Sequence, residues 1–277
     1  VAVFDEIDLD GALTTKATLH NLSIIENLEL GIGDTITVYR SNMVIPKIDD
    51  NLTRSNTLVI PNTCPCCGAT AEIKYTDNSK FLMCTNPNCS AKLLAKFTHF
   101  VSRKCANIDG LSEKTLEALI LRGFLHNYKD IYQLSTHRNK LVLLDGLGEK
   151  SIDNLLTAIE KSRDIKLENF IAALGIEGIG NAAAKTISNA FNGDYKEFID
   201  AYFYWHFDWT TLSDFGEVMS ESINSYLHDN LEMINELATE MHFVKYESKE
   251  VVDNPFNNKT LCVTGKLNHF TRDSINE

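Results

Sequence analysis

The sequence predicts a chain of several domains: a small β-barrel, a four-cysteine metal-binding segment, a long all-α region and the start of an α/β unit. Three observations support this fold class. Strand-like alternation marks residues 1–60, five of the seven cysteines lie between Cys64 and Cys89, and one glycine-centred phrase recurs through the helical pattern that follows. With 277 residues, the chain is long enough to fold as more than one compact unit.

Composition limits the class of protein. The formal net charge of −12 argues against a protein that holds nucleic acid by bulk positive charge, so any such binding must depend on local geometry. No apolar run approaches the roughly 20 residues of a membrane span, and the first residues resemble no signal peptide. The chain begins without Met on strand-like alternation and stops where a helix should start, so we expect an excerpt of a longer protein.

Residues 1–60 are predicted to form the barrel. Thr35–Arg40 is β-branched and alternating, which is typical of a strand, and it follows turn chemistry at Leu30–Asp34. Ahead of both, Ser23–Leu28 has the composition of a short helix. This order of elements suits a small β-barrel.

The cysteine-rich segment, residues 61–95, has the spacing of a zinc site. Two residues separate Cys64 from Cys67, and four separate Cys84 from Cys89. Tetrahedral Zn²⁺ binds four thiolates, and two short hairpins can supply one pair each. A segment this short buries little apolar surface, so metal binding would supply its stability. With four sulfur ligands, the site is expected to be structural.

Two alternatives to this site remain open. Cys66 could replace Cys67 as a ligand, although the two-residue gap favours Cys67. The cysteines could also be buried thiols without a metal. A secreted disulfide framework would spread its cysteines more evenly along the chain, so we expect a reducing compartment.

Residues 96–246 have a helical pattern interrupted by a repeated phrase of the form apolar-x-Gly-apolar-Gly. Its lead positions are spaced by 36, 32 and 36 residues, which indicates repeated supersecondary units; they are Gly110, Gly146, Gly178 and Asp214. We predict four tandem helix-hairpin-helix units. Tetratricopeptide repeats share the period, but their aromatic and leucine pattern is missing.

Glycine at a helix start lets consecutive backbone N–H groups point at a phosphate. Such a site binds the DNA backbone without base specificity and without net positive charge. The candidate phosphate-binding residues are Gly110, Gly146, Gly148, Lys150, Gly178, Gly180 and Gly216. Lys114 and Lys185 could add local charge. Because Ser112 and Asp214 each replace a glycine, the second and third units are the strongest candidates. The alternative is that these glycines only cap helices.

Three further segments complete the chain. The stretch Tyr202–Trp209 is unusually aromatic, and core packing is its expected role. Residues 247–258 are polar and are predicted to be a linker. Residues 259–277 are predicted to contain one buried strand and a turn, Thr260–Gly265, which would begin the α/β unit.

Taken in order, these parts resemble bacterial NAD-dependent DNA ligase from its oligonucleotide-binding (OB) barrel onward. The motifs that carry the resemblance are Ala17–Asn21, Gly33-Asp34 with Arg40–Pro46, the four-cysteine segment, Phe97–Arg103 with Ile108–Gly110, and Thr264–Leu267 with Thr271-Arg272. The last pair resembles the opening of the family's BRCT domain. The resemblance covers essentially the whole chain and is specific in combination.

The resemblance implies that Arg40, Val44 and Ile45 meet DNA near a nick. Asn42-Met43 replaces the Gly-Asp that the family has in this loop. An Arg at a strand end beside an apolar pair would also suit phosphate contact and packing against a sugar face. The alternative is a solvated arginine beside core aliphatic residues.

The resemblance further implies an enzyme that seals nicks between 3′-hydroxyl and 5′-phosphate in duplex DNA, during replication and repair. Its adenylated lysine belongs to a Lys-x-Asp-Gly motif that this chain lacks, so we expect no catalytic residue here. NAD and Mg²⁺ would be bound mainly by domains outside this sequence, and structural Zn²⁺ by the cysteines. We expect a monomer in the bacterial cytoplasm, associated with the nucleoid. The competing hypotheses are a non-enzymatic DNA-binding module of another repair protein and a protein-interaction scaffold.

Overall fold

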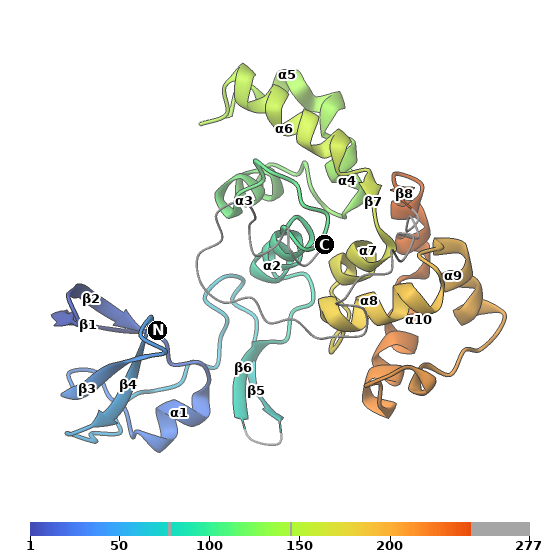
Figure 1. Cartoon of the computed structure of the whole chain (residues 1–277). Helices are drawn as coiled ribbons and strands as arrows, with labels where there is room; N and C mark the ends of the chain where they lie inside the picture. Colours follow the sequence, from blue (N-terminus) through green and yellow to red (C-terminus); the bar gives the residue numbers. More distant parts are fainter. Residues whose placement is uncertain (77–78, 145, 245–277) are drawn as a thin grey trace, which may run out of the picture.

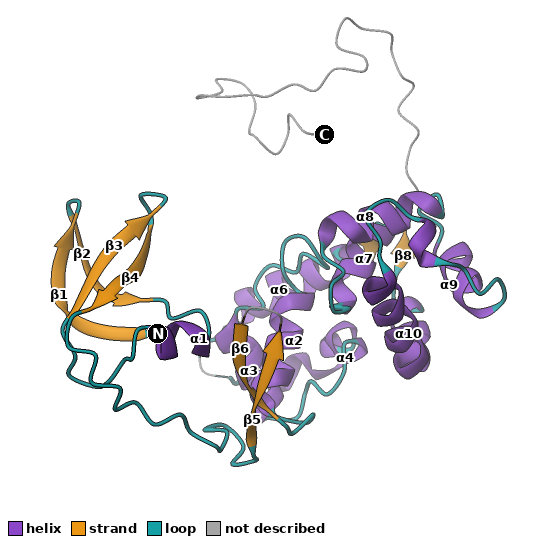
Figure 2. Cartoon of the chain, turned by 90° about the horizontal axis from the view of Figure 1, so that it is seen from below, coloured by secondary structure: helices purple, strands orange, loops and turns teal. Residues whose placement is uncertain are grey.

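The structure is a computed structural model, and it describes residues 1–76, 79–144 and 146–244. Figures 1 and 2 show the strands β1–β4 and helix α1 at one end, a mainly helical region at the other, and the β5–β6 hairpin between them. The predicted linker and BRCT start, residues 247–277, lie outside the described residues.

The N-terminal part contains two antiparallel hairpins. Strands β1 (Ala2–Leu9) and β2 (Ala12–Ala17) form one, and β3 (Ile36–Ser41) and β4 (Ile45–Asn51) form the other. A single parallel bridge between Thr18 and Lys47 connects them. Within the described residues the predicted barrel is therefore present as two open sheets and not as a closed cylinder, because no ladder of hydrogen bonds joins the two hairpins.

The predicted short helix is present as α1 (Leu22–Asn27). Its N-cap is Asn21, whose side chain accepts a hydrogen bond from the Ile24 N–H, as expected for a good capping residue. The loop after α1 is held by buried Asn51, whose amide donates to Leu28 O and to Asp34 Oδ2. These bonds fix the loop against β4.

The helical region is built around one apolar core. It contains α2 (Ser90–Phe100), α3 (Glu113–Leu121), α4 (Lys129–Tyr132), α5 (Arg138–Leu141), α6 (Glu149–Lys161), α7 (Leu167–Leu174), α8 (Asn181–Ala190), α9 (Tyr195–Phe203) and α10 (Glu217–Ala238), with short 3₁₀ turns η1 (Leu134–His137) and η2 (Trp209–Thr211). Fully buried side chains at its centre include Phe97, Phe100, Phe170 and Trp209. Helix α2 begins within residues 61–95, the predicted cysteine module, but its Phe97 and Phe100 pack in the helical core.

A parallel sheet of two short strands joins two parts of the helical region that are distant in sequence. Strand β7 (Asp164–Ile165) pairs with β8 (His242–Phe243), which brings the end of α6 to the end of α10. Arg163 reinforces this junction: its guanidinium donates to Glu160 Oε2 at 2.7 Å, to Glu240 Oε2 at 2.7 Å and to Tyr132 O at 3.0 Å. Pairing of such short strands depends on tertiary packing, and the sequence pattern does not predict it.

The aromatic stretch is divided between core and surface. Trp209 is fully buried, and its indole N–H donates to Asn224 Oδ1 at 2.9 Å. The predicted role in core packing is therefore confirmed for Trp209. It is wrong for Phe203, Tyr204 and Trp205, which are 54%, 70% and 56% exposed, because α9 ends at Phe203 and the loop that follows turns away from the core.

Candidate zinc site and nucleic-acid interface

The four predicted cysteine ligands lie together at the base of the β5–β6 hairpin. Strands β5 (Ala71–Thr76) and β6 (Ser79–Cys84) place Cys84 at the end of β6, and Cys89 is the N-cap of α2. Cys64 and Cys67 come from the turn before β5, where the Gly68 N–H donates to Cys64 O at 2.9 Å. Gly68 has φ +70°, a conformation that favours glycine and lets this turn fold back.

The sulfur atoms lie close enough together to surround one metal ion. All four lie within 4.8 Å of one another, with Cys64 Sγ 3.9 Å from Cys89 Sγ and Cys67 Sγ 3.5 Å from Cys84 Sγ. Four thiolates at 2.3 Å from one ion would be about 3.8 Å apart. Cys66 is exposed and does not belong to this group, so the geometry selects Cys67 between the two alternatives.

Backbone hydrogen bonds favour the charged form of two ligands. A bond from the backbone of Ala69 lowers the pKa of Cys67 to about 6, and bonds from the backbone of Cys67 and Cys66 lower the pKa of Cys64. Thiolate is the form that binds zinc. With four sulfurs around one centre there is no open position for substrate, so a bound ion would have a structural role.

The β5–β6 hairpin also contacts the N-terminal part. Asn21 donates to Ser79 Oγ, the Lys80 N–H donates to Ser23 Oγ at 3.0 Å, and the Lys80 ammonium forms an ion pair with Glu26 at 2.5 Å. The cysteine module therefore lies between helix α1 and the helical region, as Figure 2 shows.

All four repeated phrases share one backbone feature, a left-handed lead residue. The lead residue has positive φ in every copy: +91° at Gly110, +81° at Gly146, +78° at Gly178 and +66° at Asp214. The conformation therefore persists in the copy where Asp replaces glycine. In the last three copies a backbone hydrogen bond between the two apolar residues closes the turn. The N–H of the second apolar residue donates to the carbonyl of the first: Leu147 to Leu144 at 3.0 Å, Ile179 to Ile176 at 3.0 Å, and Phe215 to Leu212 at 3.2 Å.

The position two residues after each lead residue is the N-cap of the next helix. Ser112, Gly148, Gly180 and Gly216 all have extended backbones there. The Ser112 side chain accepts the Thr115 N–H, whereas the three glycines offer no side-chain acceptor. The first N–H groups of α6, α8 and α10 are therefore not capped from this position, and such groups are suited to an anion.

Burial orients the turns. The apolar residues on either side of each lead residue are buried or half-buried, whereas Gly110, Gly146, Gly148, Gly178, Gly180 and Gly216 are all exposed. The units also contact each other: a Cβ at Gly110 would lie 3.5 Å from Leu155 of α6, and one at Gly178 would lie 3.9 Å from Met219 of α10. The first unit thus contacts the second, and the third contacts the fourth.

Charge distinguishes the fourth unit from the others. Exposed Lys114, Lys150 and Lys185 follow the first three turns. Between residues 195 and 240 there is one lysine, Lys196, against ten carboxylates: Glu197, Asp200, Asp208, Asp214, Glu217, Glu221, Asp229, Glu232, Glu236 and Glu240. Much of the chain's negative charge is therefore concentrated around the fourth turn.

The predicted Arg40, Val44 and Ile45 lie at one end of the β3–β4 hairpin. Asn42 and Met43 both have positive φ, +52° and +59°, and with Val44 they form the three-residue loop that joins Ser41 of β3 to Ile45 of β4. Val44 is 71% exposed and Met43 is 87% exposed, so the tip is apolar and accessible. Arg40 Nε is buried and has no hydrogen-bond partner among the described residues.

Sequence analysis missed the contribution of Met43 to this apolar tip. The signal was a methionine in a short hairpin loop, at a position with positive φ where Asn or Gly is usual. Backbone strain of this kind is often found at functional sites. The structure thus brings Arg40, Met43 and Val44 to one hairpin end, separate from the glycine turns of the helical region.

The comparisons with known proteins agree with these features. Residues 1–58 match the family model of the NAD-dependent DNA ligase OB-fold domain. The chain is 41% identical to a DNA ligase of Lachnoclostridium phytofermentans over 98% of its own length and 41% of the relative. It is 37% identical to a DNA ligase of Ruminiclostridium cellulolyticum and 35% identical to one of Campylobacter lari, over 100% of this chain in both cases.

These matches confirm the resemblance to NAD-dependent DNA ligases and the OB-fold assignment of the N-terminal part. The chain spans about two fifths of the length of the relatives it matches. Among the described residues, no helix combines the length and apolar character that crossing a membrane requires.

Proposed function

We propose that this chain is the DNA-holding portion of an NAD-dependent DNA ligase and that it binds nicked duplex DNA. Within the whole enzyme, the portion described here would position the 3′-hydroxyl and 5′-phosphate ends, and phosphoryl transfer depends strongly on such positioning. The adenylated lysine, NAD and Mg²⁺ would be held mainly by other domains. We further propose a monomer in the bacterial cytoplasm, associated with the nucleoid.

The observation that carries this proposal is the shared geometry of the helix starts. Exposed glycines before α6 and α8 leave backbone N–H groups without a side-chain cap, and Lys150 and Lys185 follow them. Backbone amides at a helix start bind phosphate through the helix dipole and direct hydrogen bonds. An acidic chain can bind a polyanion in this way because the contacts are local.

The OB-fold part and the cysteine module would supply the remaining contacts. The half-buried Arg40 at this hairpin end would contact a phosphate, while Met43, Val44 and Ile45 can pack against sugars in a widened minor groove. Structural Zn²⁺ on Cys64, Cys67, Cys84 and Cys89 would order the hairpin that contacts α1. Zinc would thereby fix the position of one DNA-contacting part relative to the other.

The second candidate is a non-enzymatic DNA-binding module of another repair protein. The open hairpins and glycine turns suit it equally, because neither contains a catalytic group. The two candidates differ in what an adenylation domain adds. A fusion of this chain to the adenylation domain of a related DNA ligase should seal nicks under the first proposal, and should bind but not seal under the second.

Duplex binding is tested by fluorescence anisotropy with a labelled nicked duplex. We expect binding at low salt that weakens steeply as salt rises, because phosphate contacts release counterions. No binding at 20 mM salt would contradict the proposal and favour a protein-interaction scaffold. Removal of metal with a chelator should release zinc, unfold the cysteine module and weaken binding, while the helical circular-dichroism signal persists.

A further inference from the structure

The helical region contains two adjoining clefts lined by cations, away from the fourth turn. The first has a volume of about 320 Å³ and is lined by Arg103, Lys161 and Lys166 among others, and the second contains Lys104 and Lys185. All five cations are exposed. They come from the loop after α2, the end of α6, the start of α7 and the middle of α8, so only the tertiary structure brings them together.

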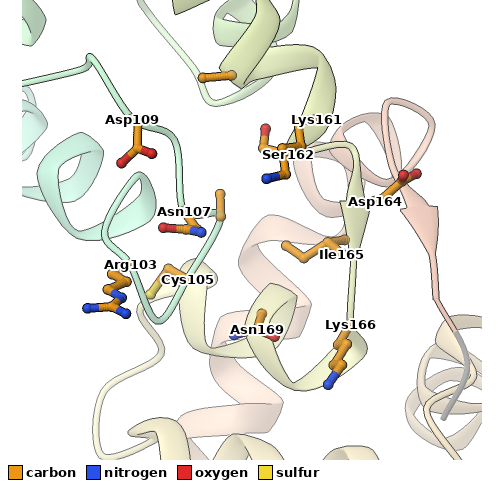
Figure 3. A pocket seen from close by; sticks show the side chains of 12 residues that line it. Arg103, Cys105, Asn107, Asp109, Lys161, Ser162, Asp164, Ile165, Lys166 and Asn169 are labelled. Carbon is orange, nitrogen blue, oxygen red and sulfur yellow. The ribbon is translucent and has the colours of Figure 1, made fainter. Parts of the chain in front are cut away.

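Figure 3 shows how the first cleft is built. Arg103 and Asn107 lie on one loop, Lys161 and Lys166 lie at the two ends of the segment that contains β7, and Asn169 lies between the two sides. Asn169 lines both clefts, and its side-chain amide donates to Lys104 O at 2.9 Å, which holds the loop against α7. The two clefts therefore form one continuous surface.

This surface connects two of the glycine turns. Asp109, beside Gly110 of the first turn, lines the first cleft. Asn181, the first residue of α8 after Gly180 of the third turn, lines the second. A polymer held at both helix starts would pass over the cations between them.

The charge of this surface is opposite to that of the whole chain. Five cations line the two clefts against three carboxylates, Asp109, Asp164 and Glu168, in a chain whose net charge is −12. One of these, Asp164, already accepts a hydrogen bond from the His242 ring at 3.1 Å. Lys and Arg that line clefts between two helix starts are suited to successive backbone phosphates.

We propose that the two clefts bind the sugar-phosphate backbone of one strand of a duplex, between the first and third helix-hairpin-helix turns. This inference rests on the proposed DNA-binding function and extends it to side chains outside the repeated phrase. Lys161, Lys166, Lys104 and Lys185 contact phosphates, and Asn169 is a positioning residue that holds Lys104 in place. The fourth turn lies outside this path.

The test is the salt dependence of duplex binding by the intact chain. Each phosphate contact contributes about −0.9 to the slope of log K against log salt. The double variants Lys161→Gln/Lys166→Gln and Lys104→Gln/Lys185→Gln should each make the slope less steep by about 2 and weaken binding at least about tenfold at 0.1 M salt. The matched control is Lys129→Gln/Lys196→Gln, which removes two lysines that form ion pairs with Glu236 and Asp200. The control should retain the wild-type slope.

The outcomes separate the two proposals. If the unmodified chain does not bind the duplex, the proposed function fails. If it binds but the cleft variants and the control share the wild-type slope, the cleft assignment fails alone. A final arm titrates inorganic phosphate at constant ionic strength: it should not displace the duplex at low millimolar concentration, and displacement would assign the clefts to a small free anion.

Discussion

The third and fourth turns of the helical region have nearly the same backbone and opposite electrostatics. Gly178 and Asp214 share positive φ, and Gly180 and Gly216 share the extended N-cap position. The third turn is followed by Lys185 and has no acidic residue in the first turn of α8, whereas α10 begins with Glu217 in the acidic stretch 195–240. The two copies thus share their turn geometry, and under the proposed function their charge would decide which of them meets DNA.

The largest expected effect comes from placing a carboxylate at the two N-caps. At Gly180 and Gly216 a Cβ would meet no atom within 4 Å, so Asp fits both sites and should cap both helices. Gly180→Asp should weaken duplex binding more than tenfold, because its charge would face a phosphate. Gly216→Asp should leave the affinity unchanged. Equal losses in anisotropy titrations would remove the distinction between the turns.

Stability offers the next comparison. Gly178→Ala places a β-carbon at φ +78° and should lower the free energy of unfolding by about 1–2 kcal/mol. Asp214→Gly should change it by less than about 0.5 kcal/mol, because Asp tolerates this conformation and glycine adds unfolded-state entropy. Urea unfolding followed by circular dichroism measures both. A large loss in Asp214→Gly would mean that its side chain stabilises the turn in another way.

Charge at the fourth turn can be changed directly. Glu217→Lys should make the salt slope steeper by about 1 if the duplex can reach α10, and should leave the slope unchanged if the duplex does not reach the fourth turn. The cleft proposal predicts no change. Glu217→Gln is the matched control for the loss of negative charge near a helix start, which should cost about 0.5 kcal/mol in stability.

The smallest effect concerns the first turn, where a serine occupies the N-cap. Ser112→Gly removes the hydrogen bond from the Thr115 N–H and should lower the free energy of unfolding by a few tenths of a kcal/mol. If this helix start meets phosphate, the same variant should bind duplex DNA slightly more tightly, because the freed N–H groups lack a competing acceptor. Tighter binding together with lower stability would indicate that the first turn binds phosphate, as proposed for the third.

Several features were predictable because they depend on local chemistry. Cysteine spacing predicted four candidate metal ligands, since a tetrahedral ion accepts only certain spacings, and the structure brings those four sulfurs together. The short helix predicted at Ser23–Leu28 is present at Leu22–Asn27, and the strand predicted from alternation at Thr35–Arg40 is present at Ile36–Ser41. The recurring glycines predicted the helix starts, because positive φ at a lead position is a local requirement.

Other features required three-dimensional contacts. Nothing in the sequence shows that Lys104 lies near Lys185 or Arg103 near Lys166, because long-range packing of α2, α6, α7 and α8 decides it. The exposed aromatic tip at Phe203–Trp205 depends on where α9 ends, and the β7–β8 pair depends on the path of α10. Sequence alone determined which residues can bind metal or shape a helix start, because ligand type and φ are properties of single residues. The tertiary structure decided which of them share a surface, because charge acts through space and not along the chain.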